Sequence, residues 1–330
     1  MKVLVTGASG MLGGATARAL EARGDDVTVL QRRPSGLGLR EVLADVADAH
    51  AVRAAVEGHQ AVLHLAAKVN VAGAEADYYR ANVDGTRAVV DACRRAGVER
   101  LVNVSSPSVA HAGMSLVGAG ADPADPRRAR GPYARTKAIA ERLALAADSG
   151  TLAVLSIRPH LVWGPGDPQL VARIVERGRT GRLPLIGTGA VLVDTTYVSN
   201  AVGALVAAVD RCAPGGVHGE ALVVSNGEPR PIAEILTGMC VAGGAPAPRR
   251  HVPVALASVA GAVAQRIWSL RGNEQDPPLN PVVVEQLSTA HWFDQRRTRT
   301  ALGWTPRVSL DDGFAELARW YASGGATLVV

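Results

Sequence analysis

The sequence is poor in cysteine and has no apolar run long enough to span a bilayer. Its 330 residues include three cysteines with no Cys-x-x-Cys pair, so we expect neither a disulfide framework nor a zinc site, and we predict no bound metal. The most lipid-like stretch, residues 252–263, is too short to cross a membrane. It is compatible with ordinary packing, with peripheral contact to a membrane surface, or with an apolar substrate entrance. No signal peptide fits before the apolar run that follows Met1 and Lys2, so we expect a cytoplasmic protein.

The charge balance is mildly positive and argues against nucleic acid as a partner. Lys and Arg number 35 against 30 for Asp and Glu, and the excess is scattered along the chain. An excess of this size is compatible with an anionic small-molecule ligand. The hydrophobic content of 48% predicts a packed globular protein, and the sequence shows neither an internal repeat nor a low-complexity tail.

Short β-branched runs alternate with alanine-rich helical stretches through the first two-thirds of the chain. Because parallel strands need helical crossovers, this alternation predicts an α/β fold with a doubly wound parallel sheet of the Rossmann type. The rhythm becomes irregular after a cluster of Gly and Pro near residue 165. We therefore predict a nucleotide-binding domain over residues 1–165, to which 190–210 return, and a smaller, partly helical substrate-binding domain over 166–330. The predicted strands include residues 2–6, 26–31, 61–67 and 100–106, and the predicted helices include residues 14–22 and 47–57.

A glycine-rich loop, TGASGMLGG, follows the first predicted strand and opens a helix. In that context Gly7, Gly10 and Gly13 predict a dinucleotide site. Glycines let the backbone turn tightly and approach a pyrophosphate, which then meets the free N–H groups of the helix N-terminus. The alternative is a plain tight turn between a strand and a helix.

The end of the second predicted strand bears on which dinucleotide is expected. Sites that prefer NAD usually carry Asp or Glu there, whereas this chain has Gln31, Arg32 and Arg33. A guanidinium binds a 2′-phosphate through charge-assisted hydrogen bonds, so NADP(H) is the predicted cofactor. The alternative is that both arginines are solvated loop residues. Asp45, further along, is placed either to accept a bond from the adenine amine or to cap a helix.

Tyr133 and Lys137 lie four residues apart in the run GPYARTK. On a helix this spacing puts both side chains on one face, where an ammonium at 137 would favour the ionised phenol at 133 and make it a usable acid or base. Ser106 ends a predicted strand, at the edge where open α/β sheets bind their ligands, and its hydroxyl is placed to hold a substrate oxygen. Together with the glycine loop, these residues predict oxidoreduction of a carbonyl or an alcohol.

The ordered set TGxxGxxG, Ser106 and YxxxK resembles the extended short-chain dehydrogenase/reductase superfamily, and the runs HLAA, NVDGT and RPHLVWGPGD extend the resemblance over nearly the whole chain. It implies that Tyr133 donates the proton in reduction and that Lys137 assists it and binds the nicotinamide ribose. Ser106, rather than Ser105, aligns with the substrate-orienting Ser or Thr. Asn82 matches an asparagine that orders the site in related enzymes, although a structural asparagine at a helix start is equally open. The implied cofactor contacts are Gly7, Ser9, Gly10, Met11, Leu12, Gly13, Gln31, Arg32, Arg33, Asp45, Val46, Ala66, Ala67, Lys68, Tyr133, Lys137 and Pro159.

Within the superfamily, runs such as SSPSVAH, LVDTTYVSNA and EQLSTAHWFD look most like the 3β-hydroxysteroid dehydrogenase-type branch. More narrowly, they look like the bacterial 2-alkyl-3-oxoalkanoate reductases of long-chain olefin biosynthesis. This likeness implies NADPH-dependent reduction of the ketone of a long-chain 2-alkyl-3-oxoalkanoic acid to the 3-hydroxy acid. Such a substrate needs a cation for its carboxylate, which Lys68 or His160 could supply; a surface lysine and a core-edge histidine are the structural alternatives. The predicted substrate residues are Lys68, Ser106, Ser108, His160 and Trp163.

Other functions share these motifs to different degrees. An NAD(P)-dependent 3β-hydroxysteroid or sterol dehydrogenase is the nearest alternative, because the motifs do not separate it from the fatty keto acid reductase. A nucleotide-sugar epimerase or dehydratase would prefer an acidic residue where Gln31 and Arg32 stand, and a non-catalytic NADP-sensing protein would commonly lack the tyrosine or the lysine. The resemblance also implies a homodimer through the helices of Asn82 and Tyr133. The olefin-pathway likeness would add a thiolase-like condensing enzyme and a β-lactone-forming ligase as partners.

Overall fold

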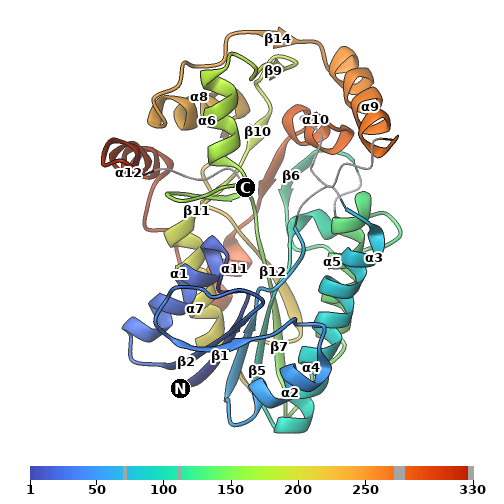
Figure 1. The fold of residues 1–330 in the computed structure, drawn as a ribbon, viewed down its shortest axis with the longest axis vertical. Coiled ribbons are helices and arrows are strands. Elements are labelled where there is room, and N and C mark those ends of the chain that lie inside the picture. The colour runs from blue at the N-terminus through green and yellow to red at the C-terminus, as the bar shows by residue number, and fades with distance from the viewer. Residues whose placement is uncertain (70–72, 111–112, 271–278, 326–330) are drawn as a thin grey trace.

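The computed structural model describes residues 1–69, 73–110, 113–270 and 279–325 (Figure 1). Its lower part is built on a seven-stranded parallel sheet with the strand order β12-β7-β5-β4-β1-β2-β3. The first strand lies inside the sheet and the chain winds outward from it in both directions, which is the doubly wound arrangement. The strands are β1 (Lys2–Thr6), β2 (Asp26–Gln31), β3 (Arg40–Leu43), β4 (Ala61–His64), β5 (Arg100–Val104), β7 (Ala153–Pro159) and β12 (Glu220–Val224).

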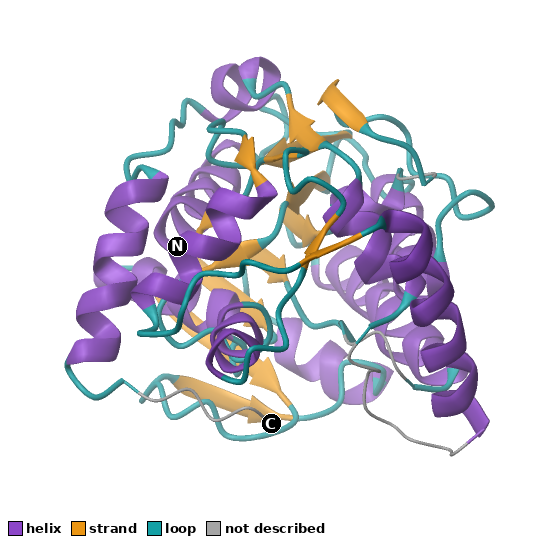
Figure 2. Cartoon of the chain, turned by 90° about the horizontal axis from the view of Figure 1, so that it is seen from above, coloured by secondary structure: helices purple, strands orange, loops and turns teal. Residues whose placement is uncertain are grey.

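Helices cover both faces of this sheet, as the view from above shows (Figure 2). Successive residues of a strand point to opposite faces, so β1 contributes Val3 and Val5 to one apolar cluster and Leu4 to the other. The first cluster packs against α1, α7 and α11, and the second against α2, α4 and α5. The helices are α1 (Met11–Ala22), α2 (Ala49–Val56), α4 (Gly85–Ala96), α5 (Gly131–Leu145), α7 (Val198–Arg211) and α11 (Arg296–Leu302).

The predicted fold class is confirmed, and the element boundaries differ in ways that have local causes. The strands predicted over 61–67 and 100–106 end earlier, at His64 and Val104. The helix predicted over 47–57 begins two residues late because Asp48 caps it, accepting hydrogen bonds from the N–H groups of His50 and Ala51. Strand β3 and a π-helical turn, η1 (Tyr79–Asp84), were not predicted.

The upper part of the molecule is smaller and mixed in structure. A four-stranded sheet in the order β13-β10-β15-β6 and three helices, α6, α8 and α12, accompany a separate apolar cluster that includes Trp163. Helices α9 and α10 pack on each other beside it (Figure 1). No helix among the described residues has both the length and the apolarity to cross a membrane. The main elements are β6 (Leu116–Ala119), α6 (Val171–Arg179), β10 (Leu192–Val193), β13 (Arg230–Pro231), α8 (Ile232–Ala242), α9 (Val254–Leu270), α10 (Pro281–Ser288), β15 (His291–Phe293) and α12 (Leu310–Ala322).

The chain passes between the two parts more than once. After the upper segment that contains α6, it returns to the sheet with α7, which packs beside α1, and with β12, which pairs with β7. It leaves again for α8, α9 and α10 and returns with α11, whose Leu302 joins the same apolar cluster as Val3. The division at residue 165 stays a prediction, but the sheet and its helices draw on segments from both sides of it.

Candidate functional site

The glycine loop connects β1 to α1 at the carboxyl end of the sheet. Gly7 has φ +80°, and a Cβ there would lie 2.8 Å from the backbone nitrogen of Ala66, so only glycine fits against the loop that follows β4. Gly13 is buried against the Gly7 carbonyl, whereas Gly10 is exposed. No side chain caps α1, and its first turn has no acidic residue, which leaves N–H groups for an anion.

These features fit a dinucleotide at the positions that the sequence predicts. The exposed Gly10 lets a pyrophosphate approach the backbone, and the dipole of α1 favours its negative charge. Ser9 is exposed, and Met11 and Leu12 are half-buried on the first turn of the helix.

A carboxylate from the neighbouring strand β3, which sequence reading missed, lies beside the end of β2. The Gln31 amide donates to Oε1 of Glu41 on β3, and the same oxygen accepts bonds from the backbone N–H and hydroxyl of Ser35 at 2.8 and 2.7 Å. These bonds lower the pKa of Glu41, with those from Ser35 contributing most. Arg32 and Arg33 are exposed, and neither guanidinium has a partner among the residues that the structure describes.

Asp45 does not cap a helix, since Asp48 takes that role in α2. Its carboxylate instead accepts a bond from the backbone N–H of Ala47 at 2.9 Å and pairs with Arg80 at 3.0 Å. The cap alternative for Asp45 is therefore wrong, while the adenine contact stays a prediction. The adjacent Val46 is buried against Gly85, where a Cβ would lie 2.6 Å from its side chain.

Ser106 and Tyr133 meet at the carboxyl end of β5. The Ser106 hydroxyl caps a short 3-10 helix, accepting from the N–H of Ser108 at 3.3 Å and lying 2.9 Å from its hydroxyl oxygen. Burial raises the pKa of Tyr133, near the start of α5, and the neighbouring Ser106 side chain opposes that shift. The structure thus brings together the serine and the tyrosine that the sequence paired.

Lys137 lies one turn after Tyr133, but its ammonium points to the backbone. Its Nζ donates to the carbonyl oxygen of Val104 at 2.5 Å, and the side chain is buried. Burial lowers the pKa of Lys137 to about 8, while the charge of Glu141 raises it. The expectation that Lys137 lowers the pKa of Tyr133 is wrong for this arrangement, because burial dominates and the phenol stays protonated.

Glu141 lies one turn after Lys137 on the same side of α5. Both of its oxygens bind Arg158 of β7, with Arg158 Nε at 2.8 Å and Nη2 at 2.5 Å, and each side chain is only 1% exposed. The remaining nitrogen, Nη1, donates to the carbonyl of Asp122 at 2.8 Å. This ion pair fixes the helix that carries the candidate acid against the sheet. Sequence reading missed Glu141, although its spacing of four from Lys137 was visible.

Asn82 ties the loop after β4 to α5. Its Oδ1 accepts from the backbone N–H of Lys68 at 2.7 Å, and its Nδ2 donates to the Lys68 carbonyl and to the Thr136 hydroxyl at 3.2 and 3.0 Å. It lies in the π-helical turn η1 rather than at a helix start, so of the two alternatives the structure favours ordering of the site. The Lys68 ammonium pairs with Asp77 at 2.9 Å and lies over the Tyr78 ring.

A buried histidine that was not predicted as a site residue lies at the end of β4. His64 Nδ1 is 2.8 Å from the hydroxyl oxygen of Thr6, and Nε2 is 3.1 Å from that of Thr86. The Thr6 hydroxyl also accepts from the N–H of Ala66 at 3.1 Å. Burial lowers the pKa of His64 to about 3, and the nearby charge of Lys137 acts in the same direction, so the ring is neutral. The motif HLAA contained the signal, because a histidine that ends a buried strand needs polar partners.

Two of the predicted substrate residues lie after β7. His160 follows the half-buried Pro159, and its Nδ1 bonds the carbonyl of Asp194 while the ring packs against Phe293 at 4.9 Å between centroids. Trp163 has no exposed surface, since it stacks on Phe314 and donates its indole N–H to Thr195. Its assignment as a substrate residue is therefore wrong: it belongs to the core of the upper part.

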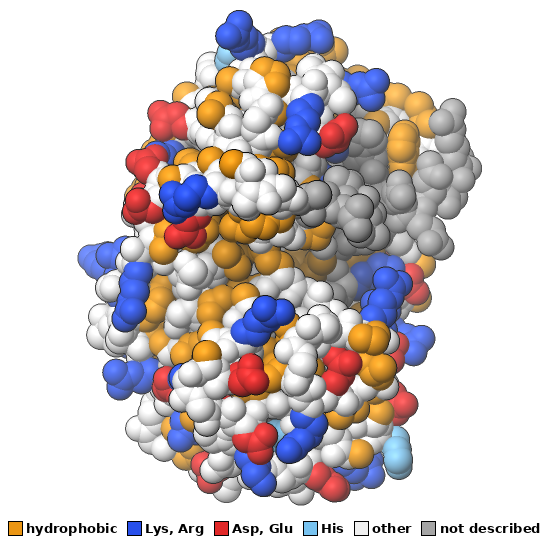
Figure 3. Space-filling view, turned by 60° about the vertical axis from the view of Figure 1, so that its left-hand side comes forward, with side chains coloured by type: hydrophobic (Ala, Val, Ile, Leu, Met, Phe, Trp, Pro, Cys, Tyr) orange, Lys and Arg blue, Asp and Glu red, His pale blue; other side chains and the backbone are white. Residues whose placement is uncertain are grey.

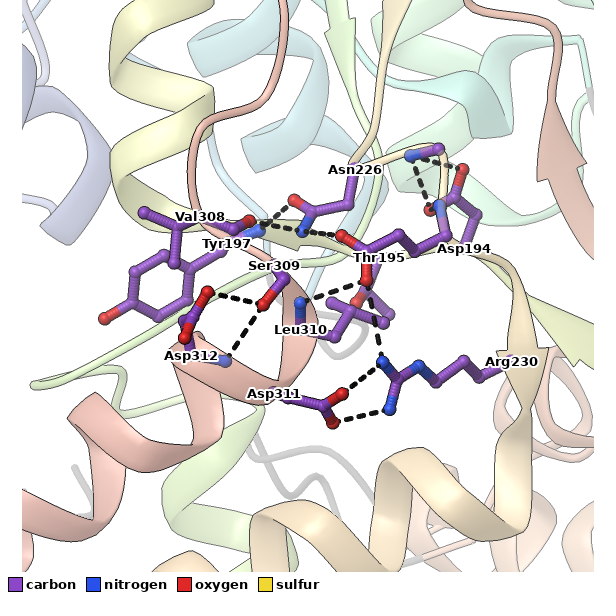
Figure 4. A network of polar contacts seen from close by, with 12 residues as sticks. Asp194, Thr195, Tyr197, Asn226, Arg230, Val308, Ser309, Leu310, Asp311 and Asp312 are labelled. Carbon is purple, nitrogen blue, oxygen red and sulfur yellow. Dashed lines mark hydrogen bonds and ion pairs between the residues drawn. The ribbon is translucent and has the colours of Figure 1, made fainter.

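A polar network fastens the upper part to the end of β12 (Figure 4). Asn226 accepts from the Tyr197 N–H at 3.0 Å and donates to the Val308 carbonyl at 3.0 Å, and Arg230 binds Asp311 through two bonds of 2.7 and 2.8 Å. Asp194 accepts bonds from Ser225 and from two backbone N–H groups, and burial raises its pKa to about 6. These contacts join the upper part to the segment that follows β12.

On one face of the molecule, the side chains between the lower and upper parts are of the kind that would suit a small-molecule ligand. Hydrophobic side chains gather across the middle of that face, between the lower part with the sheet and the upper part (Figure 3). Positive and negative side chains alternate above and below them, so this face shows no continuous basic patch of the kind that binds nucleic acid (Figure 3).

Comparison with known proteins agrees with this geometry. The model of the NAD dependent epimerase/dehydratase family matches residues 3–224. A 2-alkyl-3-oxoalkanoate reductase of Stenotrophomonas maltophilia (strain K279a) is 42% identical over 324 residues, which cover 96% of this chain and 98% of that protein. A 3-beta-hydroxysteroid dehydrogenase of Mycolicibacterium neoaurum is 30% identical over 343 residues, with 99% and 93% covered.

Solved structures give the same fold. MoeE5 in complex with UDP-glucose and NAD superposes with a TM-score of 0.76 at 27% identity, covering 99% of this chain and all of that one (100%). The matched family region contains the glycine loop, Ser106, Tyr133 and Lys137. The chain therefore belongs to the NAD dependent epimerase/dehydratase family, the extended short-chain dehydrogenases/reductases that its motifs resemble.

Proposed function

We propose that this protein is an oxidoreductase that uses NADPH to reduce the ketone of a 2-alkyl-3-oxoalkanoic acid to the 3-hydroxy acid. The observation that carries the reaction type is that Ser106 and Tyr133 lie together at the carboxyl end of β5, where Ser106 acts on the pKa of the phenol, with Lys137 one turn further along α5. The substrate class is supported by the 42% identical relative, whose name gives that substrate.

The chain's own residues would carry the proton and hold the oxygen. When bound, the dinucleotide supplies a hydride to the ketone carbon. Ser106 donates a hydrogen bond to the carbonyl oxygen as negative charge grows there, and Tyr133 transfers its phenolic proton to the same oxygen, which gives the alcohol. Because burial raises the pKa of Tyr133, the phenol stays protonated at neutral pH and is ready to act as the acid. Water then returns a proton to the phenolate.

The test is turnover by the purified protein. NADPH oxidation should depend on a 2-alkyl-3-oxoalkanoic acid, and Tyr133→Phe should lower kcat by about 10²- to 10⁴-fold, the usual contribution of general acid catalysis. Tyr79→Phe is the matched control, because it makes the same chemical change at a tyrosine whose side chain is 42% exposed, and it should keep the parent rate. Turnover that survives Tyr133→Phe would refute the proposed acid.

A second candidate, a 3β-hydroxysteroid dehydrogenase, is favoured by the relative of that name at 30% identity. The same assay with a ketosteroid separates the two candidates. If kcat/KM is higher for the ketosteroid than for the keto acid, the 3β-hydroxysteroid dehydrogenase becomes the preferred candidate. A nucleotide-sugar substrate, as bound to MoeE5, ranks lower because no acidic side chain follows β2 directly.

The NADPH preference is supported by Arg32 and Arg33 after β2, which are exposed and have no partner within the described part of the chain. Glu41 is the residue that would oppose a 2′-phosphate, but its carboxylate already accepts bonds from Gln31 and Ser35. Replacing Arg32 and Arg33 with Ala should raise KM for NADPH by about tenfold or more and leave KM for NADH nearly unchanged, since each lost charge-assisted bond is worth about 1.5–3 kcal/mol. Arg40→Ala, on the neighbouring strand, is the control; equal effects on both cofactors would contradict the assignment.

Several finer predictions rest on the resemblance. Lys68 and Ser108 are half-buried at the carboxyl edge of the sheet, and His160 follows β7 there, so these three stay candidates for the substrate. A homodimer through the helices of Asn82 (η1, continued by α4) and Tyr133 (α5) also stays a prediction, as does assembly with a condensing enzyme and a β-lactone-forming ligase.

A further inference from the structure

Helix α9 presents its large apolar side chains outward. Val259 and Leu256 are 63% and 60% exposed, and Val263 and Ile267 are 53% and 42% exposed. Their spacing places them along one side of the helix, where they form a continuous stripe. The helix lies at the outer edge of the upper part (Figure 1). We call these four residues the α9 apolar stripe.

The inward side of α9 carries small residues in the first half of the helix. Ala257 is buried against Ile186 and Val284, and a Cβ on Gly261 would lie 3.2 Å from the backbone of Asn280 in front of α10. A helix whose outer side meets only water normally has the opposite pattern. In α4, for example, Val89, Val90 and Cys93 are buried, and the exposed positions include Asp91 and Arg94.

The stretch of sequence that contains α9 carries charge of one sign. No Asp or Glu occurs in the sequence between Glu234 and Glu274. Arg249 and Arg250, just before the helix, are exposed, and their guanidinium groups have no partner in the part of the chain that the structure describes. The one acidic residue of the adjacent α10, Glu285, is already paired with Arg130 at 2.5 Å.

We propose that the α9 apolar stripe and the two arginines before it dock on the surface of an anionic phospholipid bilayer. An interfacial helix buries its apolar side at the boundary between headgroups and acyl chains, and nearby arginines attract anionic headgroups. A second copy of this chain is the competing occupant, and the oligomeric state of the parent and of the stripe variant distinguishes it from a bilayer. This inference does not rest on the proposed function, since binding is measured without turnover.

The experiment is co-sedimentation of the full chain with phosphatidylcholine vesicles that contain or lack phosphatidylglycerol. The protein should bind the anionic vesicles, and raising the salt concentration should release it. Val259→Ser with Val263→Ser should weaken binding by about tenfold or more, given the apolar area returned to water. Arg249→Gln with Arg250→Gln should weaken binding to anionic vesicles and leave any residual binding to neutral ones unchanged.

The matched control is Val241→Ser, which changes a valine of 61% exposure on α8 and should bind like the parent. Circular dichroism and thermal melting of each variant separate a lost surface contact from a folding defect. No binding by the parent, or equal binding by the stripe variant, overturns the proposal. So does a parent that is dimeric by light scattering and becomes monomeric in the stripe variant, because the stripe would then belong to a protein interface.

Discussion

Replacing Arg158 with Met tests the buried ion pair that fixes α5 to the sheet. The substitution leaves the Glu141 carboxylate buried at 1% exposure without its cation, and it also removes the donor to the Asp122 carbonyl. Breaking a buried pair by removing one partner typically lowers stability by about 3–5 kcal/mol, because the remaining charge must be desolvated alone. We therefore expect the free energy of unfolding of Arg158→Met to fall by about that amount.

The double variant Glu141→Leu with Arg158→Met tests whether the loss in Arg158→Met comes from the unpaired carboxylate. Apolar groups of similar size often replace a buried pair with little loss, so the double variant should be more stable than Arg158→Met alone. Urea unfolding followed by circular dichroism measures both differences. Arg297→Met is the control, since its pair with Glu220 leaves the arginine 63% exposed and should be worth less than about 1 kcal/mol.

Two outcomes would refute the reasoning about this pair. One is a loss in Arg158→Met no larger than that in Arg297→Met. The other is a double variant less stable than Arg158→Met. The pair also affects a candidate catalytic residue. Because the charge of Glu141 raises the pKa of Lys137, the double variant should lower the pKa of Lys137.

Two further predictions concern pH. Because burial lowers the pKa of Lys137 to about 8, kcat/KM for NADPH should fall as the pH rises through that value, and Lys137→Arg should keep its rate to higher pH; a flat profile in the parent would contradict this. His64 has a pKa of about 3 in the folded chain and about 6.5 when unfolded, so the unfolded chain takes up its proton first. The free energy of unfolding should therefore fall as the pH drops from 6.5 toward 3, by up to about 1.4 kcal/mol per pH unit, and His64→Gln should reduce this slope. Urea unfolding at several pH values measures it, the exposed His50→Gln serves as the control, and equal slopes in both variants would sink the explanation.

Local sequence patterns were enough to predict the fold class and the glycine loop. Strand β1 and strand β2 have the boundaries that were predicted, because a β-branched run bordered by polar residues defines a buried strand with little help from the rest of the chain. Gly7 and Gly13 could be predicted for the same reason, since a tight turn into a helix demands glycine whatever surrounds it.

The features that were missed depend on contacts between distant residues. Trp163 is buried because Phe314, far along the chain, stacks on it. The Lys137 ammonium points to the backbone because the Val104 carbonyl of a neighbouring strand accepts a hydrogen bond from it, and no helical spacing could reveal that acceptor. The Glu41 carboxylate reaches Gln31 only because β3 pairs with β2, and β3 itself was too short and too exposed to be recognised.

The way the chain returns to its sheet has a consequence for protein engineering. A fragment that ends near residue 165 would lack β12 and the helices α7 and α11, so β7 would become an open edge and one face of the sheet would lose two of its helices. Exchanging the upper part with that of a relative consequently requires several junctions rather than one. Chimeras joined on both sides of α7, of β12 and of α11 would exchange the upper part and keep the sheet with its covering helices.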